Sequence, residues 1–281
     1  VLTLPLVGLC ALSVRWLRPG RPRLMAAVAA GLTAAGFIQI GAYGRSFEEG
    51  SHIRHALVRR DHTATVISFG QGFNRHLLVN GYGMTVLTTL TKIMAHLPLA
   101  SLDHPPKRAL VIAFGMGTTF RSLLSWGIPA TAVELVPSVV AAFDDYHDDA
   151  QAIRENLRAE IVIDDGRRFL ARTDHRFDVI TLDPPPPVET AGSSLLYARE
   201  FYALAQARLA PGGIVHQWFP DGIRVESVLR EAVLRSAAAA FPHMRIYQSH
   251  HGFGLHILLS MEPIAVPNAS RFIQNMPPEA L

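Results

Sequence analysis

The sequence predicts an α/β fold in which a parallel sheet carries helices on both faces. Transmembrane segments and then a small β-hairpin domain are expected before it in the sequence. Three observations lead to this prediction. From residue 109 onward, short apolar runs of strand length alternate with segments of helical spacing. These runs are mostly apolar, and residues 109–114 are apolar throughout, as in strands buried on both faces. Near the start, a 20-residue stretch without charge is long enough to span a bilayer.

The composition excludes several classes of protein. Only 17% of the 281 residues are charged, against about 25% in an ordinary soluble chain, and 49% are hydrophobic, which excludes a disordered protein. The single cysteine, Cys10, excludes an internal disulfide and any cysteine-based metal cluster. The net charge of +3 comes without a cluster of basic and aromatic residues, so nucleic acid is not expected as a partner.

The apolar excess is concentrated at the start, where we expect transmembrane segments over residues 1–45. Residues 24–43 carry no charge and would form a helix about 30 Å long, the thickness of a hydrocarbon core. Residues 1–14 are also uncharged but too short to span, and are interpreted as the end of a truncated span. A buried soluble helix is the weaker alternative, because residues 24–43 show no polar face.

Residues 46–102 are expected to form a small β-hairpin domain with a linking helix. The expected strands and helix are 63–69, 75–79 and 85–97. The Asn80-Gly81 pair is a typical hairpin turn. Pro98 is expected to end the helix.

Residues 103–263 alternate between strand and helix patterns and are expected to form the main sheet of seven strands. The predicted strands are 109–114, 130–135, 160–163, 177–182, 214–218, 244–248 and 255–260, the last two forming a hairpin. Two predicted helices follow the first two strands and end at 126 and near 150. Three more are predicted over 166–172, 198–209 and 224–241. Residues 264–281 are interpreted as a proline-rich tail.

Candidate binding residues follow the first two strands of this sheet, at the edge where open α/β sheets bind ligands. Gly115 and Gly117 follow the first strand, and they would let a ligand approach the backbone and a helix N-terminus closely. Glu134 ends the second strand and could accept hydrogen bonds from a ribose diol. The structural alternatives are packing for the glycines and a solvated charge for Glu134.

Two further acids follow the next strands. Asp165-Gly166 follows the third strand, where the carboxylate could bind an adenine amino group or simply cap the helix. Asp183 follows the fourth strand and precedes four prolines, which would present it rigidly or form only a stiff loop. Each residue alone favours the structural explanation, but the ordered series at four strand ends favours a nucleoside site.

Together with the motifs around them, these residues resemble the spermidine synthase (polyamine aminopropyltransferase) family. This family is a branch of the class I S-adenosylmethionine-dependent methyltransferase fold, a Rossmann-like sheet. The resemblance covers residues 63–260. Further motifs that carry it are Ala95-His96-Leu97-Pro98-Leu99, Arg167-Arg168-Phe169-Leu170, Phe177-Asp178-Val179-Ile180, Leu196-Tyr197, Glu200-Phe201-Tyr202 and Pro211-Gly212-Gly213. With apolar spans in front, the chain most resembles the bacterial membrane-fused members.

The resemblance implies a role for each candidate residue. It implies Gly115 and Gly117 beside the aminopropyl or aminoacyl part of the nucleoside, Glu134 on the ribose, and Asp165 with Gly166 at the adenine. It implies Asp183 as the base for an incoming amine. The further candidate substrate-binding residues are Tyr197 and Glu189.

The resemblance also implies a reaction, partners and a location. Decarboxylated S-adenosylmethionine, or S-adenosylmethionine itself, would be the co-substrate of a transferase acting on a small amine in polyamine biosynthesis. A homodimer and a place at the bacterial inner membrane, with the soluble domain in the cytoplasm, are expected. Equal numbers of arginines on the two sides of the second apolar stretch leave the orientation open. No metal is expected, because no histidines have ligand spacing on one helix face.

The sequence departs from the family pattern where a polyamine would bind. Met116 and Pro186 stand where the family usually has acids, and Leu90-Thr91-Lys92 aligns with a triplet that normally ends in an acid. Two alternatives therefore stay open. One is N-methylation of a less cationic substrate, because Asp183-Pro184-Pro185 also resembles the loop of amine-directed methyltransferases. The other is a non-catalytic nucleoside-binding domain attached to a transporter-like membrane part.

Overall fold

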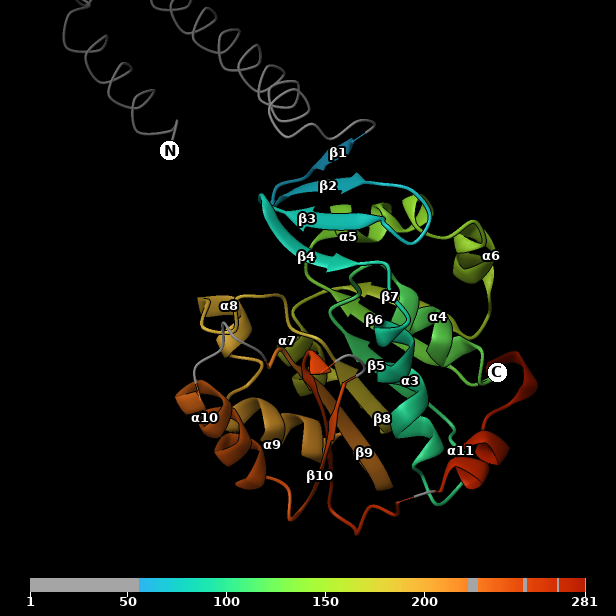
Figure 1. Cartoon of the computed structure of the whole chain (residues 1–281), viewed down its shortest axis with the longest axis vertical. Coiled ribbons are helices and arrows are strands. Elements are labelled where there is room, and N and C mark those ends of the chain that lie inside the picture. Colours follow the sequence, from blue (N-terminus) through green and yellow to red (C-terminus); the bar gives the residue numbers. More distant parts are fainter. Residues whose placement is uncertain (1–55, 222–226, 250–251, 267, 281) are drawn as a thin grey trace, which may run out of the picture. The chain divides into compact units, whose positions relative to one another are not determined.

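The computed structural model describes residues 56–280, except 222–226, 250–251 and 267. Residues 57–281 form one compact unit that contains two sheets. The first is a four-stranded antiparallel sheet in the order β1-β2-β3-β4 (Figure 1). Its strands are β1 (Leu57–Arg60), β2 (Thr65–Phe69), β3 (His76–Val79) and β4 (Tyr82–Val86). The turn between β3 and β4 is formed by Asn80 and Gly81, both with positive φ, as the sequence pattern indicated.

The second sheet has seven strands in the order β10-β11-β9-β8-β5-β6-β7. Its strands are β5 (Ala109–Ile112), β6 (Ala130–Glu134), β7 (Ala159–Ile163), β8 (Phe177–Leu182), β9 (Leu209–Phe219), β10 (His243–Gln248) and β11 (Leu255–Ser260). Strands β5 to β9 pair in parallel, and the β10–β11 hairpin adds an antiparallel edge. The predicted α/β sheet is therefore confirmed.

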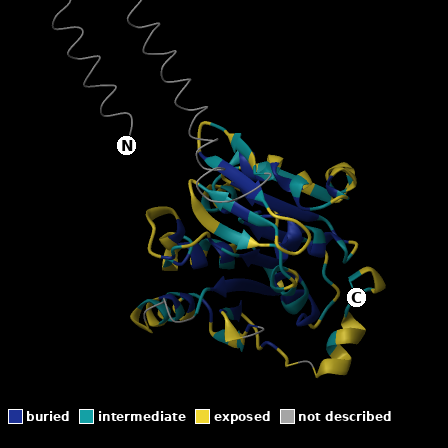
Figure 2. Ribbon diagram, turned by 45° about the horizontal axis from the view of Figure 1, so that its top comes forward, coloured by how far each residue is buried: buried dark blue, intermediate teal, exposed yellow. Residues whose placement is uncertain are grey.

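Helices cover both faces of the large sheet. The helices are α3 (Leu90–Ala100), α4 (Thr118–Leu124), α5 (Pro137–Ala141), α6 (Ala150–Glu155), α7 (Gly166–Arg172), α8 (Ala191–Ser194), α9 (Arg199–Ala207), α10 (Ser227–Ala238) and α11 (Ala269–Asn275). One core lies under α3 and α4 and includes Val111; the other lies under α7, α9 and α10 and includes Leu110. Alternate residues of β5 thus enter opposite cores, which explains why this strand is apolar throughout. Figure 2 shows the strands of the large sheet mostly in the colour of buried residues.

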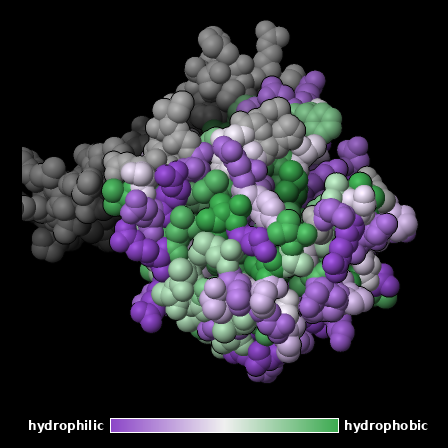
Figure 3. Space-filling model, turned by 60° about the horizontal axis from the view of Figure 1, so that its bottom comes forward, coloured by the Kyte–Doolittle hydropathy of each residue, from purple (hydrophilic) through white to green (hydrophobic). Residues whose placement is uncertain are grey.

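The described surface mixes apolar and polar side chains. Figure 3 shows a face on which hydrophobic side chains lie among hydrophilic ones. Large apolar side chains such as Phe73 and Tyr82 are mostly exposed.

The helix predicted over residues 85–97 is displaced in the structure. Thr85 and Val86 belong to strand β4, where they pair with Leu77 and His76 across the hairpin. The helix begins only at Leu90 and continues through Pro98 to Ala100. Strand pairing outweighed the helical spacing of the apolar residues, because the tight turn brings β4 into register with β3.

Pro98 does not end α3, because a neighbouring strand satisfies the carbonyl that a proline leaves free. Proline has no N–H to donate to the residue four positions earlier, which is Met94. The Thr181 hydroxyl on β8 donates to the Met94 carbonyl oxygen at 3.0 Å instead. His216 on β9 contacts the same hydroxyl through Nδ1 at 2.8 Å.

Two other predicted elements differ from the structure. The single helix expected to end near residue 150 is replaced by the shorter α5 and a 3₁₀ turn (Phe143–Asp145), and α6 begins only at Ala150. Pro211-Gly212-Gly213, expected to separate a helix from a strand, lies inside β9. Gly212 has a φ of 72° there, and the pairing with β8 shifts register, so the proline sits at an irregularity that tolerates it.

Polar contacts tie the small sheet to the large one. Arg59 on β1 forms a two-pronged ion pair with Asp145, with one N–O distance of 2.8 Å. Asp61 accepts a hydrogen bond from the backbone N–H of Ser138 at 2.7 Å. The Tyr146 hydroxyl donates to Ser68 on β2 at 2.7 Å. These contacts fix the position of the small sheet beside the strand ends of β5 and β6.

The membrane prediction requires a correction. In the described part of the chain, no helix has both the length and the apolar character that crossing a membrane requires. The expected bacterial inner-membrane location is therefore wrong for these residues. The spans predicted over residues 1–45 lie outside the described residues. The domain boundaries at 45/46, 102/103 and 263/264 stay predictions.

Candidate active site

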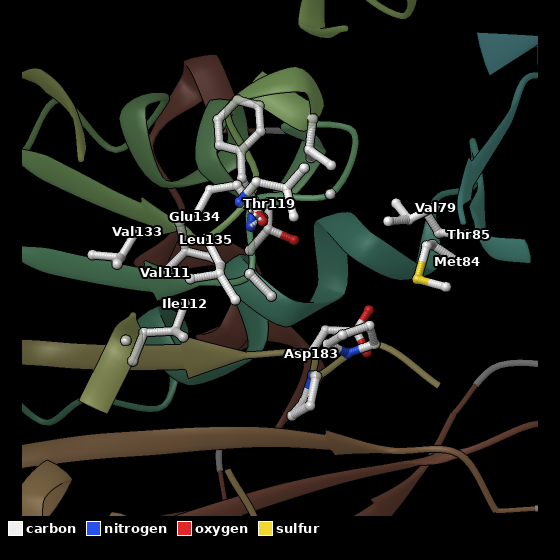
Figure 4. A pocket seen from close by; sticks show the side chains of 18 of the residues that line it. Val79, Met84, Thr85, Val111, Ile112, Thr119, Val133, Glu134, Leu135 and Asp183 are labelled. Carbon is white, nitrogen blue, oxygen red and sulfur yellow. Dashed lines mark hydrogen bonds between the residues drawn. The ribbon is translucent and has the colours of Figure 1, made fainter. Parts of the chain in front are cut away.

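A cavity of about 330 Å³ lies at the carboxyl ends of β5, β6, β7 and β8, where the sequence placed a ligand. Its far wall comes from β3, β4 and α3. Figure 4 shows Val79, Met84 and Thr85 on one side of the cavity and Glu134 and Leu135 on the other, with Asp183 between them. The cavity is therefore formed by both sheets.

Glu134, the last residue of β6, is buried at the floor of the cavity. Its two carboxylate oxygens accept hydrogen bonds from the backbone N–H groups of Phe114 and Val136, each at 2.9 Å. Burial raises the pKa of Glu134 above its usual value, although these backbone donors act in the opposite direction. Each oxygen keeps a second lone pair for a ligand hydroxyl.

Asp165 and its neighbour Asp164 line the cavity beyond β7. Asp165 caps helix α7 by accepting from the backbone N–H groups of Arg167 and Arg168, at 2.9 and 3.1 Å. Burial opposes ionisation, but the guanidinium of Arg167 and these bonds hold the pKa of Asp165 below its usual value. Asp164 pairs with the Arg168 side chain. Asp165 thus caps the helix, which was one of the two roles considered from the sequence, and it also lines the cavity.

Asp183 follows β8 and lies in the cavity. Burial raises the pKa of its carboxyl to about 7. Among the described residues it forms no ion pair. The Tyr197 hydroxyl is buried without a hydrogen-bond partner among these residues, and burial and the charge of Asp183 raise its pKa. A buried carboxyl that titrates near neutrality is suited to exchange a proton with an amine.

The glycines of the first turn have different surroundings. Gly115 has a φ of 55° and lines the cavity, and a Cβ at this position would meet no atom within 4 Å. Gly117 has a φ of 77°, and a Cβ there would lie 2.3 Å from the Phe143 ring. Ala113, between β5 and Gly115, also has a positive φ, of 69°. This turn thus holds an uncommon backbone conformation at the cavity edge.

The structure brings five of the eight predicted site residues into one cavity: Gly115, Glu134, Asp165, Gly166 and Asp183. Gly117 does not line it and instead packs against Phe143. Tyr197 is buried and does not line the cavity, but it lies close enough to Asp183 for that carboxylate to raise the pKa of its hydroxyl. Glu189 is exposed and does not line the cavity, although its neighbour Thr190 does.

Sequence reasoning missed the wall opposite the strand ends. Leu77, Val79, Met84 and Val86 of the small sheet line the cavity, together with Thr85. Strand β4 was not predicted, so nothing in the sequence pattern placed its side chains at the site. The Asn80-Gly81 turn was the available signal, because a tight hairpin there implies a second strand directly after it.

The lining is acidic. Glu134, Asp164, Asp165 and Asp183 line the cavity, and its described lining contains no lysine, arginine or histidine. No group of three possible metal ligands is found among the described residues. The cavity is therefore suited to an organic cation that also carries hydroxyl groups.

Comparisons with known proteins agree on one family. A family model described as the spermine/spermidine synthase domain matches residues 88–250. A polyamine aminopropyltransferase of Saccharolobus solfataricus is 28% identical over 202 residues, covering 67% of this chain and 66% of that protein. One from Thermococcus kodakarensis is 32% identical over 186 residues, covering 61% and 63%. The chain thus spans about two thirds of the length of these relatives.

Solved structures show the same fold. The crystal structure of a spermidine synthase from Thermotoga maritima matches with a TM-score of 0.66 at 22% identity, covering 81% of this chain and 77% of that one. A spermidine synthase in complex with the transition-state analogue AdoDATO matches with a TM-score of 0.67 at 21% identity, covering 81% and 78%. At this identity the likeness establishes the Rossmann-like methyltransferase-type fold.

Proposed function

The chain belongs to the spermine/spermidine synthase family, and on this premise we propose that it transfers an aminopropyl group from decarboxylated S-adenosylmethionine to an amine. The observation that carries the proposal is the acidic cavity at the strand ends. Decarboxylated S-adenosylmethionine carries a sulfonium and an ammonium but no carboxylate. The described lining contains four carboxylates, of which Asp164 and Asp165 are already paired with arginines, and no basic side chain. It therefore favours these positive charges, whereas the carboxylate of S-adenosylmethionine would find no cation among the described lining residues.

The nucleoside would bind along the ends of β5, β6 and β7. Glu134 would accept hydrogen bonds from the ribose hydroxyls through the lone pairs that its backbone bonds leave free. Asp165 or Asp164 would accept from the adenine amino group. Gly115 would let the co-substrate pass close to the backbone, because the space where a Cβ would point is open. For Gly117 we propose a packing function, and Glu189 receives no role.

Asp183 would be the catalytic base. An amine attacks only when neutral, so the carboxylate of Asp183 would first take a proton from the bound ammonium. The amine nitrogen would then form a bond to the propyl carbon next to sulfur while that C–S bond breaks. The electron pair of the broken bond goes to sulfur, which leaves as a neutral thioether and needs no charge stabilisation. For Tyr197, whose buried hydroxyl senses the charge of Asp183, we propose a positioning role.

The reaction is tested with the full chain, decarboxylated S-adenosylmethionine and a panel of amines, by measuring release of methylthioadenosine. We expect release that depends on an amine. Calorimetry with decarboxylated S-adenosylmethionine and S-adenosylmethionine gives the binding preference. Methyl transfer from S-adenosylmethionine in place of aminopropyl transfer would overturn the proposal. Tight nucleoside binding without product from any amine would identify a non-catalytic binding domain.

We also propose that the chain forms a homodimer through the small sheet. Leu57, Phe73 and Tyr82 are more than half exposed there, which is costly for large apolar side chains in water. Sedimentation of the wild type and of a Tyr82→Glu variant tests this assembly. A monomeric wild type would exclude it.

A further inference from the structure

We propose that the acceptor is a primary monoamine with an apolar substituent, and not a diamine with a charge at each end. This inference rests on the proposed aminopropyl transfer and concerns the half of the cavity beyond Asp183. Its far side, here called the hairpin wall, consists of Leu77, Val79, Met84, Thr85 and Val86. Helix α3 extends this wall with Thr91 and Met94.

The hairpin wall and α3 offer no negative charge. The sequence contains no aspartate or glutamate between Asp61 and Asp103, a segment that includes β3, β4 and the whole of α3. The charged residue next to Thr91 is a cation, Lys92. A second ammonium on this side would therefore lose water without gaining a carboxylate.

The polar groups of the wall are already bonded to the backbone. The Thr85 hydroxyl donates to the Val86 carbonyl at 3.3 Å, and the Thr91 hydroxyl donates to the Thr88 carbonyl at 2.9 Å. Neither can compensate a buried charge as a carboxylate would. The remaining surface consists of aliphatic and thioether side chains, which favour methylene and methyl groups by about fourfold in affinity per buried methylene.

One carboxylate remains for the acceptor. Asp164 and Asp165 pair with Arg168 and Arg167, and Glu134 lies at the nucleoside end beside Phe114. Asp183 lies between that end and the hairpin wall (Figure 4). A single ammonium would therefore bind at Asp183, and the substituent on its carbon would lie against Met84 and Val79.

The atoms of the transfer balance with this acceptor. The ammonium of R–NH₃⁺ gives one proton to Asp183, and the resulting amine forms an N–C bond to the propyl group as the C–S bond breaks. The products are the N-alkylated aminopropylamine, with its new nitrogen protonated, and neutral methylthioadenosine. No further reactant is needed.

The test compares amines of equal chain length with one and two nitrogens: n-butylamine against 1,4-diaminobutane, and n-hexylamine against 1,6-diaminohexane. With decarboxylated S-adenosylmethionine and the full chain, kcat/KM is measured by methylthioadenosine release. We expect each monoamine to exceed its diamine by at least about tenfold, and hexylamine to exceed butylamine. A diamine preferred by tenfold would overturn the inference and leave aminopropyl transfer standing. Absence of product with all four amines would overturn the proposed function itself.

A matched pair of variants tests whether the hairpin wall sets this preference. Met84→Glu places a carboxylate on the wall and is expected to shift the diamine-to-monoamine ratio of kcat/KM by at least about tenfold toward the diamine. Met84→Gln has the same shape without the charge and is expected to keep the monoamine preference. Equal diamine-to-monoamine ratios of kcat/KM in the two variants would show that the hairpin wall does not discriminate acceptors by their charge.

Discussion

The four carboxylates of the cavity differ in how far the fold already satisfies them. Glu134 accepts from two backbone N–H groups, and Asp164 and Asp165 pair with arginines. Asp183 has neither a hydrogen-bond donor nor an arginine as partner among the described residues, and burial raises its pKa to about 7. A protein tolerates such an uncompensated buried acid at a cost in stability, so its position in the cavity favours a functional reason.

Replacing Asp183 by asparagine is expected to lower turnover by about 10²- to 10⁴-fold, because the variant has no base for the ammonium. Nucleoside affinity should change little. In the wild type, kcat/KM should rise as pH increases through about 7, where the Asp183 carboxyl ionises. Methylthioadenosine release between pH 5 and 9 measures both effects. A variant with wild-type turnover would remove Asp183 as the base.

The same residue predicts a stability effect with a defined sign. Because its folded-state pKa of about 7 is above the usual value of 3.8, the folded protein binds the proton more tightly than the unfolded chain. The stability contribution is complete below about pH 4 and is lost as pH rises through 7. Asp183→Asn should therefore raise the unfolding free energy at pH 8 by roughly 2–4 kcal/mol and hardly change it at pH 4. Urea unfolding of the wild type and the variant at pH 4 and pH 8 measures the change in unfolding free energy. The same change at both pH values would contradict the prediction.

The glycine turn gives a matched pair of substitutions. Gly115→Ala places a methyl group in open cavity space, so nucleoside affinity should fall at least about tenfold with only about 1 kcal/mol lost in stability. Gly117→Ala drives a methyl group into Phe143 and should cost about 2–4 kcal/mol. Calorimetry and urea unfolding separate the two effects. The reverse order would mean that Gly117, not Gly115, is the binding glycine.

Among the elements, those fixed by local pattern were predicted well and those fixed by distant partners were not. Helix α7 and strand β8 match their predicted bounds, because apolar runs and turn residues define both ends. Strands β1 and β4 were missed, since they depend on pairing with β2 and β3. The same holds for the site. The acids at strand ends were predictable from spacing, but the hairpin wall depends on where a second sheet packs.

Helix α3 shows how a distant partner overrides a local signal. Pro98 was expected to end it, yet the helix continues because the Thr181 hydroxyl donates a hydrogen bond to the Met94 carbonyl oxygen. Thr181→Val should lower the unfolding free energy by about 1–3 kcal/mol, since the carbonyl and His216 both lose a partner. Thr181→Ser keeps the hydroxyl and should lose clearly less. Urea unfolding measures the difference, and equal losses in both variants would show that the hydroxyl, which only valine lacks, contributes no more than the methyl group, which only serine lacks.

At the scale of the whole molecule, the cavity depends on how the two sheets are held together. The ion pair of Arg59 with the mostly buried Asp145 is part of that attachment. Arg59→Met should lower the unfolding free energy by about 1–3 kcal/mol, because it leaves Asp145 unpaired. If the small sheet then loosens, KM for the amine should rise while nucleoside affinity stays near the wild-type value. An equal loss for both ligands would show that the contact does not act on the hairpin wall alone.

The origin of the cavity in two sheets has a consequence for evolution and engineering. The nucleoside half is embedded in parallel strands that also build the main cores, so substitutions there are costly. The hairpin wall lies on β3 and β4 of the small sheet, which a tight turn joins. Leu77 of this wall also belongs to the core under α3 and α4, but Met84 and Val86 are not fully buried and can be exchanged without rebuilding the large sheet. Exchanging these positions between relatives would change acceptor choice while the donor stays the same. Diversification of such enzymes would therefore proceed through a few positions of one short hairpin.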